Sequence, residues 1–175
     1  MICMEHEAVA KIFFLNSIFT SMAKVEIYTD GAARGNPGRG GYGVVLKYGE
    51  KEKELSAGFR KTTNNRMELL AVITGLESLT REGLEVHIYS DSKYVVEAIN
   101  QKWVFRWQKK GFKNKKNPDL WLRFLKIYPK HHVTFHWVKG HNAHEYNERC
   151  DVLATNAADG THLHIDEVYE ASEGV

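Results

Sequence analysis

Hydrophobic and polar positions along the chain follow two periods. A period of two, which is typical of strands, marks residues 25–29, 40–48, 52–59, 85–89 and 132–138. Helical spacing marks residues 65–79, 93–100, 119–128 and 145–158. Thr63 or Asn64 is available to cap the first of these helices. Three successive strands, followed by helices that alternate with strands, predict an α/β fold with a mixed sheet and helices packed on its faces.

The composition is that of a globular chain with one domain. The 175 residues are 43% hydrophobic and 26% charged and include 3 Pro, which excludes a disordered, collagen-like or repeat-array protein. Two cysteines, Cys3 and Cys150, do not make a disulfide framework and are typical of a reducing compartment. We therefore expect a cytoplasmic protein, and we expect it to be a monomer.

The two ends of the chain differ from the region between them. The apolar stretch 12–19 is interrupted by Asn16 and is shorter than the about 20 residues that cross a bilayer. Glu5 and Glu7 ahead of it argue against a signal peptide, so we expect no membrane association. We interpret residues 1–21 as an upstream extension or an over-long reading frame, and residues 22–159 as the domain. Residues 159–175 carry five acids and no Lys or Arg, which predicts a mobile acidic tail over 160–175.

The formal net charge of +2 conceals one strongly basic segment. Residues 102–116 contain seven Lys and Arg and no acid, which predicts an anionic partner. The aromatic residues between these charges are Trp103, Phe105, Trp107 and Phe112. They would offer flat apolar faces beside cations such as Lys109 and Lys110, a combination that favours nucleic acid over a merely solvated charged helix.

Acidic residues end two of the predicted strands. Asp30 follows the strand 25–29 and Asp91 follows the strand 85–89, each at a predicted turn. If these strands are parallel neighbours, both carboxylates emerge at one sheet edge, where open α/β sheets bind ligands. Glu68, in the first turn of the helix 65–79, and Asp151, about one turn into the last helix, extend this set.

Four carboxylates close together would repel one another unless cations neutralised them. Oxygen ligands without accompanying Cys favour Mg²⁺ or Mn²⁺ over zinc. Taken singly, each acid has a simpler explanation, as a turn residue, a charge near a helix N-terminus or a solvated helix position.

Six motifs resemble those of one known family. They are YTDGAARGNPG at 28–38, GGYG at 40–43, TTNNRMEL at 62–69, YSDS at 89–92, WVKGH at 137–141 and NERCD at 147–151. In order and spacing over residues 22–159 they resemble the type 1 ribonucleases H, the bacterial ribonuclease HI group. The resemblance implies the ribonuclease H-like fold, a five-stranded mixed sheet with helices on both faces. It also implies the activity, which is endonucleolytic cleavage of the RNA strand of RNA–DNA hybrids.

The resemblance implies catalytic roles residue by residue. The four acidic metal ligands of the family fall on Asp30, Glu68, Asp91 and Asp151. They would hold two Mg²⁺ ions roughly 4 Å apart, with Mn²⁺ as a substitute, for an in-line displacement. The expected products carry 5′-phosphate and 3′-hydroxyl ends, and the expected role is removal of RNA primers and R-loops. His141 matches the family's mobile histidine, which moves protons or helps product release.

The resemblance also implies contacts with the RNA–DNA hybrid. Asn36, Asn64 and Asn65 carry amides suited to a minor groove, where the RNA strand displays its 2′-hydroxyl. Thr63 matches a residue of the family's pocket for a DNA-strand phosphate, and helix N-termini favour anions. Helix capping is the alternative for Asn64 and Asn65. The basic segment, about residues 102–117, resembles the family's basic handle, with Trp103, Lys109 and Lys110 as expected contacts.

Three other functions are weighed against a hybrid nuclease. A nucleic-acid-binding module on the same fold would gain nothing from four repelling carboxylates around an empty site. A DNA-cutting integrase or transposase relative would share the fold and metals, but the basic handle and the asparagines favour a hybrid substrate. The nine His suggest a zinc protein, yet no Cys stands at ligand spacing from them.

Overall fold

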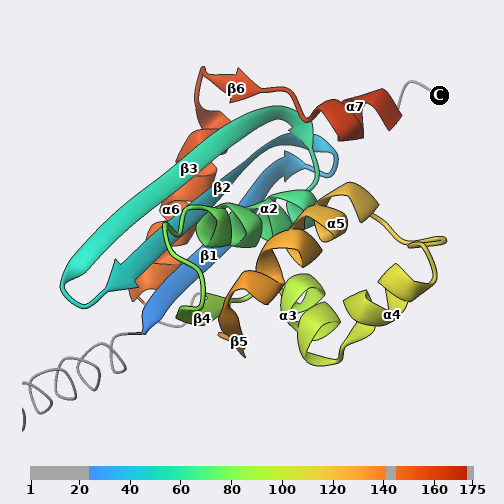
Figure 1. Ribbon diagram of the computed structural model, residues 1–175. Helices are drawn as coiled ribbons and strands as arrows, with labels where there is room; N and C mark the ends of the chain where they lie inside the picture. The colour runs from blue at the N-terminus through green and yellow to red at the C-terminus, as the bar shows by residue number, and fades with distance from the viewer. Residues whose placement is uncertain (1–23, 141–144, 173–175) are drawn as a thin grey trace, which may run out of the picture.

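A computed structural model describes residues 24–140 and 145–172. Its centre is a six-stranded sheet with the order β5-β4-β1-β2-β3-β6 (Figure 1). The strands are β1 (Val25–Gly35), β2 (Gly38–Tyr48), β3 (Lys51–Thr62), β4 (Glu85–Ser90), β5 (His132–Trp137) and β6 (Leu163–His164). β2 is antiparallel to β1 and β3, whereas the other three pairs of neighbours are parallel. The predicted mixed sheet is confirmed, with the two-residue β6 as one strand more than the five expected.

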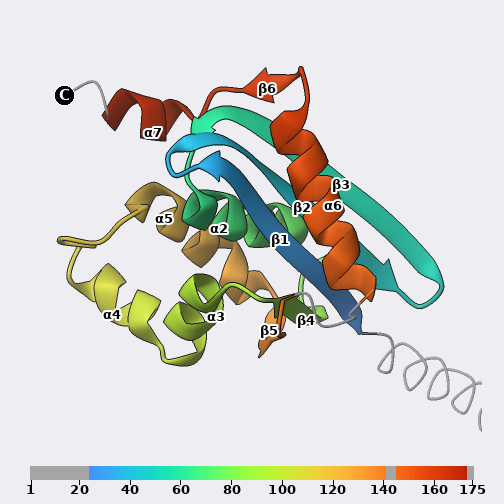
Figure 2. The same cartoon turned by 180° about the vertical axis from the view of Figure 1, so that it is seen from behind.

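Helices cover both faces of this sheet, as predicted. They are α2 (Asn64–Glu77), α3 (Lys93–Asn100), α4 (Trp103–Lys109), α5 (Pro118–Ile127), the 3₁₀ helix η1 (Tyr128–Lys130), α6 (Glu145–Asp159) and α7 (Glu167–Ser172). Figures 1 and 2 show α2, α3 and α5 on one face and α6 on the other, with α4 beyond α3 and farther from the sheet. Within the described parts of the chain, none of the helices has the length and apolar character needed to cross a membrane.

The main hydrophobic core lies between the sheet and the helices α2, α3 and α5. Ile27 and Ile88 from the sheet are fully buried there with Leu69, Ile73 and Leu76 of α2. Burial of each such side chain contributes about 1.5–3 kcal/mol. Residues 66–73 are all buried because the sheet packs on one side of α2 and α5 on the other. This makes α2 the central helix of the domain, and it carries Glu68.

Small residues on the other face of the sheet let α6 approach it closely. A Cβ atom on Gly43 would overlap the carbonyl oxygen of Cys150, and one on Gly41 would lie 2.5 Å from the carbonyl oxygen of Ala154. Gly43 is also the partner of Asp30 in the register of β1 and β2. The close packing of α6 therefore fixes Asp151, the residue after Cys150, beside the middle of β1.

Two expectations about the elements are wrong. β1 does not turn at Asp30 and Gly31 but continues to Gly35, because β2 pairs with it residue by residue from Tyr48 back to Gly38. The acidic tail is not without regular structure, because residues 163–164 form β6 and residues 167–172 form α7. The cause is tertiary, since Asp166 at the start of α7 is buried against Arg66 of α2.

Candidate active site

Parallel pairing brings the first two acids together. β1 and β4 run side by side in a register that ends at Thr29 and Ser90, so Asp30 and Asp91 follow at the same edge of the sheet, as predicted. Glu68 reaches this edge from α2 because Gly31 has no side chain. A Cβ atom on Gly31 would overlap the amide nitrogen of Glu68. Asp30, Glu68 and Asp91 each offer a carboxylate oxygen, and the three oxygens lie within 4.8 Å of one another.

Glu68 is buried with half of its carboxylate unpaired. Its Oε1 accepts a hydrogen bond of 3.3 Å from Nδ2 of Asn64, while its buried Oε2 has no hydrogen-bond partner. An unpaired buried carboxylate oxygen is costly, and a cation is the partner that compensates it best. Glu68 lies in the second turn of α2 rather than the first, because the helix already begins at Asn64. A role as a first-turn charge on the helix dipole is therefore excluded.

The acids in this cluster resist ionisation. Burial raises the pKa of Asp30 to about 7, with further contributions from the charges of Asp91 and Asp151, against the hydrogen bond of 2.8 Å that the Gly31 N–H donates to it. Burial and the charges of Asp30 and Asp91 raise the pKa of Glu68 well above its usual range. A divalent cation would reverse these shifts, because opposite charge favours the ionised carboxylate.

Asp151 stands close to this cluster without belonging to its tight group of three. It is partly buried and is the seventh residue of α6, nearly two turns into the helix rather than one. Its charge contributes to the raised pKa of Asp30, which places the two carboxylates within electrostatic reach. His141, the fifth predicted catalytic residue, lies outside the described residues.

The predicted substrate contacts fall in two places. In the first, the backbone N–H of Asn64 donates a 3.2 Å hydrogen bond to Oδ1 of Asn36. Asn36, Thr63 and Asn65 line one pocket beside the start of α2. The Thr63 side chain makes no capping hydrogen bond although the residue stands at the N-cap, and Asn64 is already helical. Thr63 therefore occupies the predicted N-cap position without a side-chain cap, and the capping alternative is not supported for Asn64 and Asn65, which both lie inside the helix.

The second place is the basic handle, residues 102–117, formed by α4 and the turns after it. Its seven cations, Lys109 and Lys110 among them, are all exposed. Most of its aromatic residues point inward instead, which corrects the expected row of flat faces. Phe112 is buried, and the Trp107 ring packs edge-on against Trp121 at 5.9 Å. Trp103, 37% exposed, is the aromatic side chain of the handle that reaches solvent most clearly.

The pocket at the start of α2 has further lining residues that the sequence analysis missed. Arg66, Tyr169 and Ser172 contribute to it. Arg66 stands inside the TTNNRMEL motif, a signal that could have drawn attention to it. Tyr169 and Ser172 belong to the segment predicted to be mobile, and no local pattern connects them with residues 36–66.

The fold and the site define a class, a mixed α/β protein whose carboxylates gather where the parallel pairing of β1 and β4 ends and suit divalent cations. A family model described as RNase H matches residues 22–159. The relative from Rippkaea orientalis called Ribonuclease H is 54% identical over 155 residues, covering 86% of this chain and 94% of the relative. That from Lachnoclostridium phytofermentans is 57% identical over 158 residues, covering 84% and 99%.

Solved structures agree with these matches. LC9-RNase H1 is 30% identical with a TM-score of 0.69, covering 87% of this chain and 82% of its own. LC11-RNase H1 in complex with RNA/DNA hybrid is 32% identical with a TM-score of 0.57, covering 78% and 97%. The chain belongs to the ribonuclease H family of nucleases, in the type 1 group that its motifs resemble.

Proposed function

We propose that this protein hydrolyses the RNA strand of RNA–DNA hybrids with divalent cations held by Asp30, Glu68, Asp91 and Asp151. The observation that carries the proposal is the set of three carboxylates within 4.8 Å, with one buried Glu68 oxygen left unpaired. Membership of the ribonuclease H family supports the reaction. The hybrid bound by LC11-RNase H1 supports the class of substrate.

The donor set fits Mg²⁺. Its members are carboxylate oxygens, which hard cations prefer, and no Cys stands among them. We propose two Mg²⁺ ions in the substrate complex, with Mn²⁺ as a substitute. When bound, the ions supply charge stabilisation at the scissile phosphate and lower the pKa of the attacking water, and the expected products carry 5′-phosphate and 3′-hydroxyl ends.

The residues of the chain hold these ligands in place. The Gly31 N–H fixes one oxygen of Asp30, and the Asn64 amide fixes one oxygen of Glu68. The indole N–H of Trp137 donates a 3.0 Å hydrogen bond to the backbone carbonyl of Asp91, which ties the end of β4 to β5. Asp30 and Glu68 would release their protons on binding cations, because burial and neighbouring charges raise the pKa of both carboxyls. We propose His141 as the group that moves a proton or helps product release.

Recognition of the hybrid uses both contact regions. Asn36, Asn64 and Asn65 face the minor groove with the 2′-hydroxyls of the RNA strand, and Thr63 contacts a DNA-strand phosphate. Lys109 and Lys110 contact backbone phosphates across the basic handle, and Trp103 offers its exposed ring to the hybrid. The logarithm of the affinity for the hybrid falls linearly with the logarithm of the salt concentration, and replacing either Lys with Ala lowers the magnitude of this salt slope by about one. An unchanged slope in both variants would remove the basic handle from the interface.

The decisive experiment offers the protein labelled RNA–DNA hybrid, single-stranded RNA and duplex DNA. Each substrate is incubated with Mg²⁺, Mn²⁺ or EDTA, alongside Asp30→Asn, Asp91→Asn and the control Glu97→Gln. Glu97 is an exposed acid on α3 outside the cluster. We expect cleavage of the hybrid's RNA strand by wild type and control, and loss of cleavage in EDTA and in both active-site variants.

Three outcomes would overturn this proposal. Hybrid binding without cleavage would indicate a non-catalytic module, cutting of duplex DNA would indicate an integrase-like activity, and full activity in EDTA would exclude the cation site. End-labelling of the fragments before and after phosphatase treatment tests the 5′-phosphate. We further propose that the protein acts as a cytoplasmic monomer on RNA primers and R-loops. Light scattering tests the monomeric state. R-loop levels in cells that lack the gene for this protein test its role in removing R-loops.

A further inference from the structure

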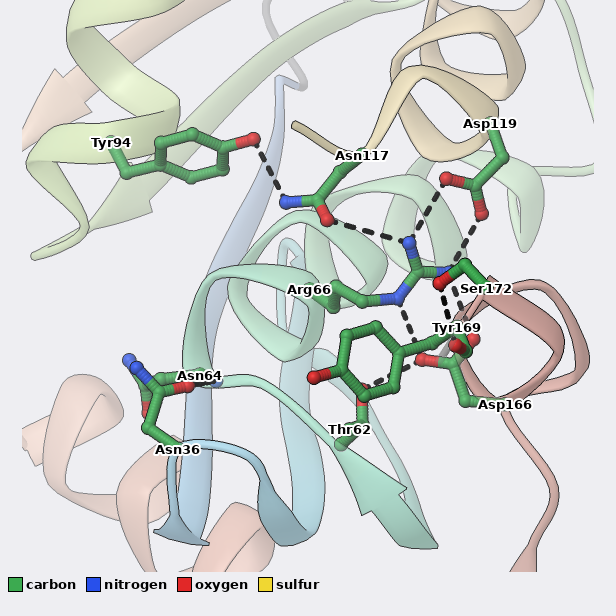
Figure 3. Close-up of polar contacts among 10 residues, drawn as sticks. All are labelled: Asn36, Thr62, Asn64, Arg66, Tyr94, Asn117, Asp119, Asp166, Tyr169 and Ser172. Atoms are coloured by element: carbon green, nitrogen blue, oxygen red, sulfur yellow. Dashed lines mark hydrogen bonds and ion pairs between the residues drawn. The ribbon is translucent and has the colours of Figure 1, made fainter. Parts of the chain in front are cut away.

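One buried arginine joins three segments that are distant in sequence. The Arg66 guanidinium is 4% exposed and forms a paired set of hydrogen bonds with each of two carboxylates (Figure 3). Toward Asp166 the donor–acceptor distances are 2.7 and 2.8 Å, and toward Asp119 they are 2.9 and 2.7 Å. Thr62 adds a hydroxyl bond of 2.7 Å to Asp166. Because both planar carboxylates match the guanidinium fork, the three segments are held in a fixed orientation.

These segments are the start of α2, the start of α5 directly after the basic handle, and the C-terminal segment, residues 163–172. The C-terminal segment has two further attachments to the sheet. β6 pairs with β3 at Gly58 and Phe59, and Glu170 of α7 forms an ion pair of 2.7 Å with Arg60. The C-terminal segment is therefore fastened at three points beside the pocket at the start of α2.

The fastened C-terminal segment forms one wall of that pocket. Asn36, Thr63 and Asn65 line one side, and Tyr169 and Ser172 of α7 line another. The Tyr169 ring lies 5.8 Å from the guanidinium carbon of Arg66, so the same arginine that holds Asp166 also supports this ring. Figure 3 shows Tyr169 and Ser172 next to the Arg66 cluster. Three residues expected to touch the hybrid thus share a pocket with the C-terminal segment.

The charges of this wall allow a nucleic-acid backbone to approach. Arg66 is shared between Asp166 and Asp119, which also lines the pocket, so these three groups together carry one negative charge. Arg60, by contrast, compensates Glu170. The exposed Lys116, from the end of the basic handle, also lines the pocket. The charge of Lys116 balances the remaining negative charge of the Arg66 cluster, so these groups together carry no net charge although the C-terminal segment is acidic in composition.

We propose that the C-terminal segment is part of the hybrid-binding surface, with Tyr169 and Ser172 as contact residues and Asp166 as the positioning residue that docks the segment on Arg66. This inference rests on the proposed function. It assigns a binding role to a segment whose composition indicates only a solvated tail. It excludes an autoinhibitory role, in which an acidic tail would compete with the substrate for the pocket.

The test separates substrate binding from chemistry. The variants Tyr169→Ala, Ser172→Ala and Asp166→Asn are compared with Glu167→Gln, which removes an exposed acid from the same helix outside the pocket lining. We measure kcat and KM with Mg²⁺, and the hybrid Kd in EDTA. We expect each of the first three variants to raise KM and Kd by about fivefold to tenfold, the loss of about one hydrogen bond or packed ring. We expect kcat to be unchanged in these three variants, and the control Glu167→Gln to keep the wild-type kcat, KM and Kd.

Further variants separate contact from support. Tyr169→Phe keeps the ring on Arg66, so it should recover most of the affinity that Tyr169→Ala loses. Lys116→Ala should lower the salt slope by about one, whereas the neutral change Tyr169→Ala should leave the slope unchanged. Thermal unfolding of each variant identifies those in which Asp166→Asn or another change has loosened the fold.

The outcomes distinguish this inference from the proposed function. A wild-type protein that does not cleave hybrids would refute the proposed function itself. Cleavage by wild type with unchanged KM and Kd in Tyr169→Ala and Ser172→Ala would refute the binding role of the segment. Tighter binding after removal of residues 163–172 would show the autoinhibitory role instead.

Discussion

The crowding of carboxylates predicts that this active site destabilises the protein when no cation is bound, and Asp30→Asn isolates the effect. Burial, with the charges of Asp91 and Asp151, raises the pKa of Asp30 from 3.8 to about 7. A rise of about three units corresponds to about 4 kcal/mol, at about 1.36 kcal/mol per unit. This is the free energy by which the folded protein disfavours the ionised Asp30 relative to the unfolded chain.

The sign of the pH dependence follows from proton binding. The folded state binds the Asp30 proton more tightly than the unfolded state does, so the associated stability is fully present below the unfolded pKa of 3.8. It is lost as the pH rises through about 7. Asn carries no charge, and its side-chain oxygen can still accept the Gly31 N–H. Without metal at about pH 8, Asp30→Asn should therefore be more stable than wild type by up to about 4 kcal/mol.

The assay is urea unfolding followed by circular dichroism, in EDTA, from about pH 4 to about pH 8. Asp30→Asn is compared with wild type and with the control Glu97→Gln. The stability difference should be small near the acid end and grow with pH, and Mg²⁺ should narrow it by binding the folded wild type. A wild type as stable as Asp30→Asn at about pH 8 in EDTA, or a difference independent of pH, would refute the electrostatic reasoning.

Gly43→Ala places a methyl group on the carbonyl oxygen of Cys150 and pushes α6 away from the sheet. We therefore expect the free energy of unfolding to fall by about 1–3 kcal/mol, and an unchanged melting temperature would contradict the close packing of α6. Burial raises the pKa of the Cys150 thiol to about 12. In a Cys3→Ser variant this thiol should react with Ellman's reagent as slowly as the protein opens, and rapid labelling would show that it is accessible. Burial lowers the pKa of His136 below its usual 6.5, so its contribution to stability is present above 6.5 and is lost as the pH falls below it. In the Asp30→Asn background, His136→Gln should reduce the loss of stability between about pH 7 and about pH 5, and equal losses in urea titrations would exclude this contribution.

Local periodicity in the sequence determined most of the secondary structure. The helix 93–100 and the strand beginning at 85 lie where their patterns predict. One exception is β1: an Asp-Gly pair commonly forms a turn, but here Asp30 and Gly31 continue the strand. Pairing with β2 decides this, and a partner strand is not visible in the local pattern.

The candidate site likewise has features that the sequence predicts and features that depend on the tertiary structure. That Asp30 and Asp91 share a sheet edge follows from two strands in parallel, which the order of elements already predicts. That Glu68 joins them depends on the bare backbone of Gly31 and on the packing of α2. The handle sequence shows its charge, but the sequence does not show that Trp107 and Phe112 turn inward to pack with the core.

The conformation of the C-terminal segment is determined by tertiary contacts alone. Its composition is acidic and polar, which by itself predicts a solvated tail. Asp166 forms an ion pair with Arg66, which lies a hundred residues away in the sequence, and the same arginine also binds Asp119. An ion pair across that separation has no periodicity and no motif. Its physical basis is the burial of the Arg66 guanidinium in the tertiary structure, since a buried charge is costly unless opposite charges compensate it.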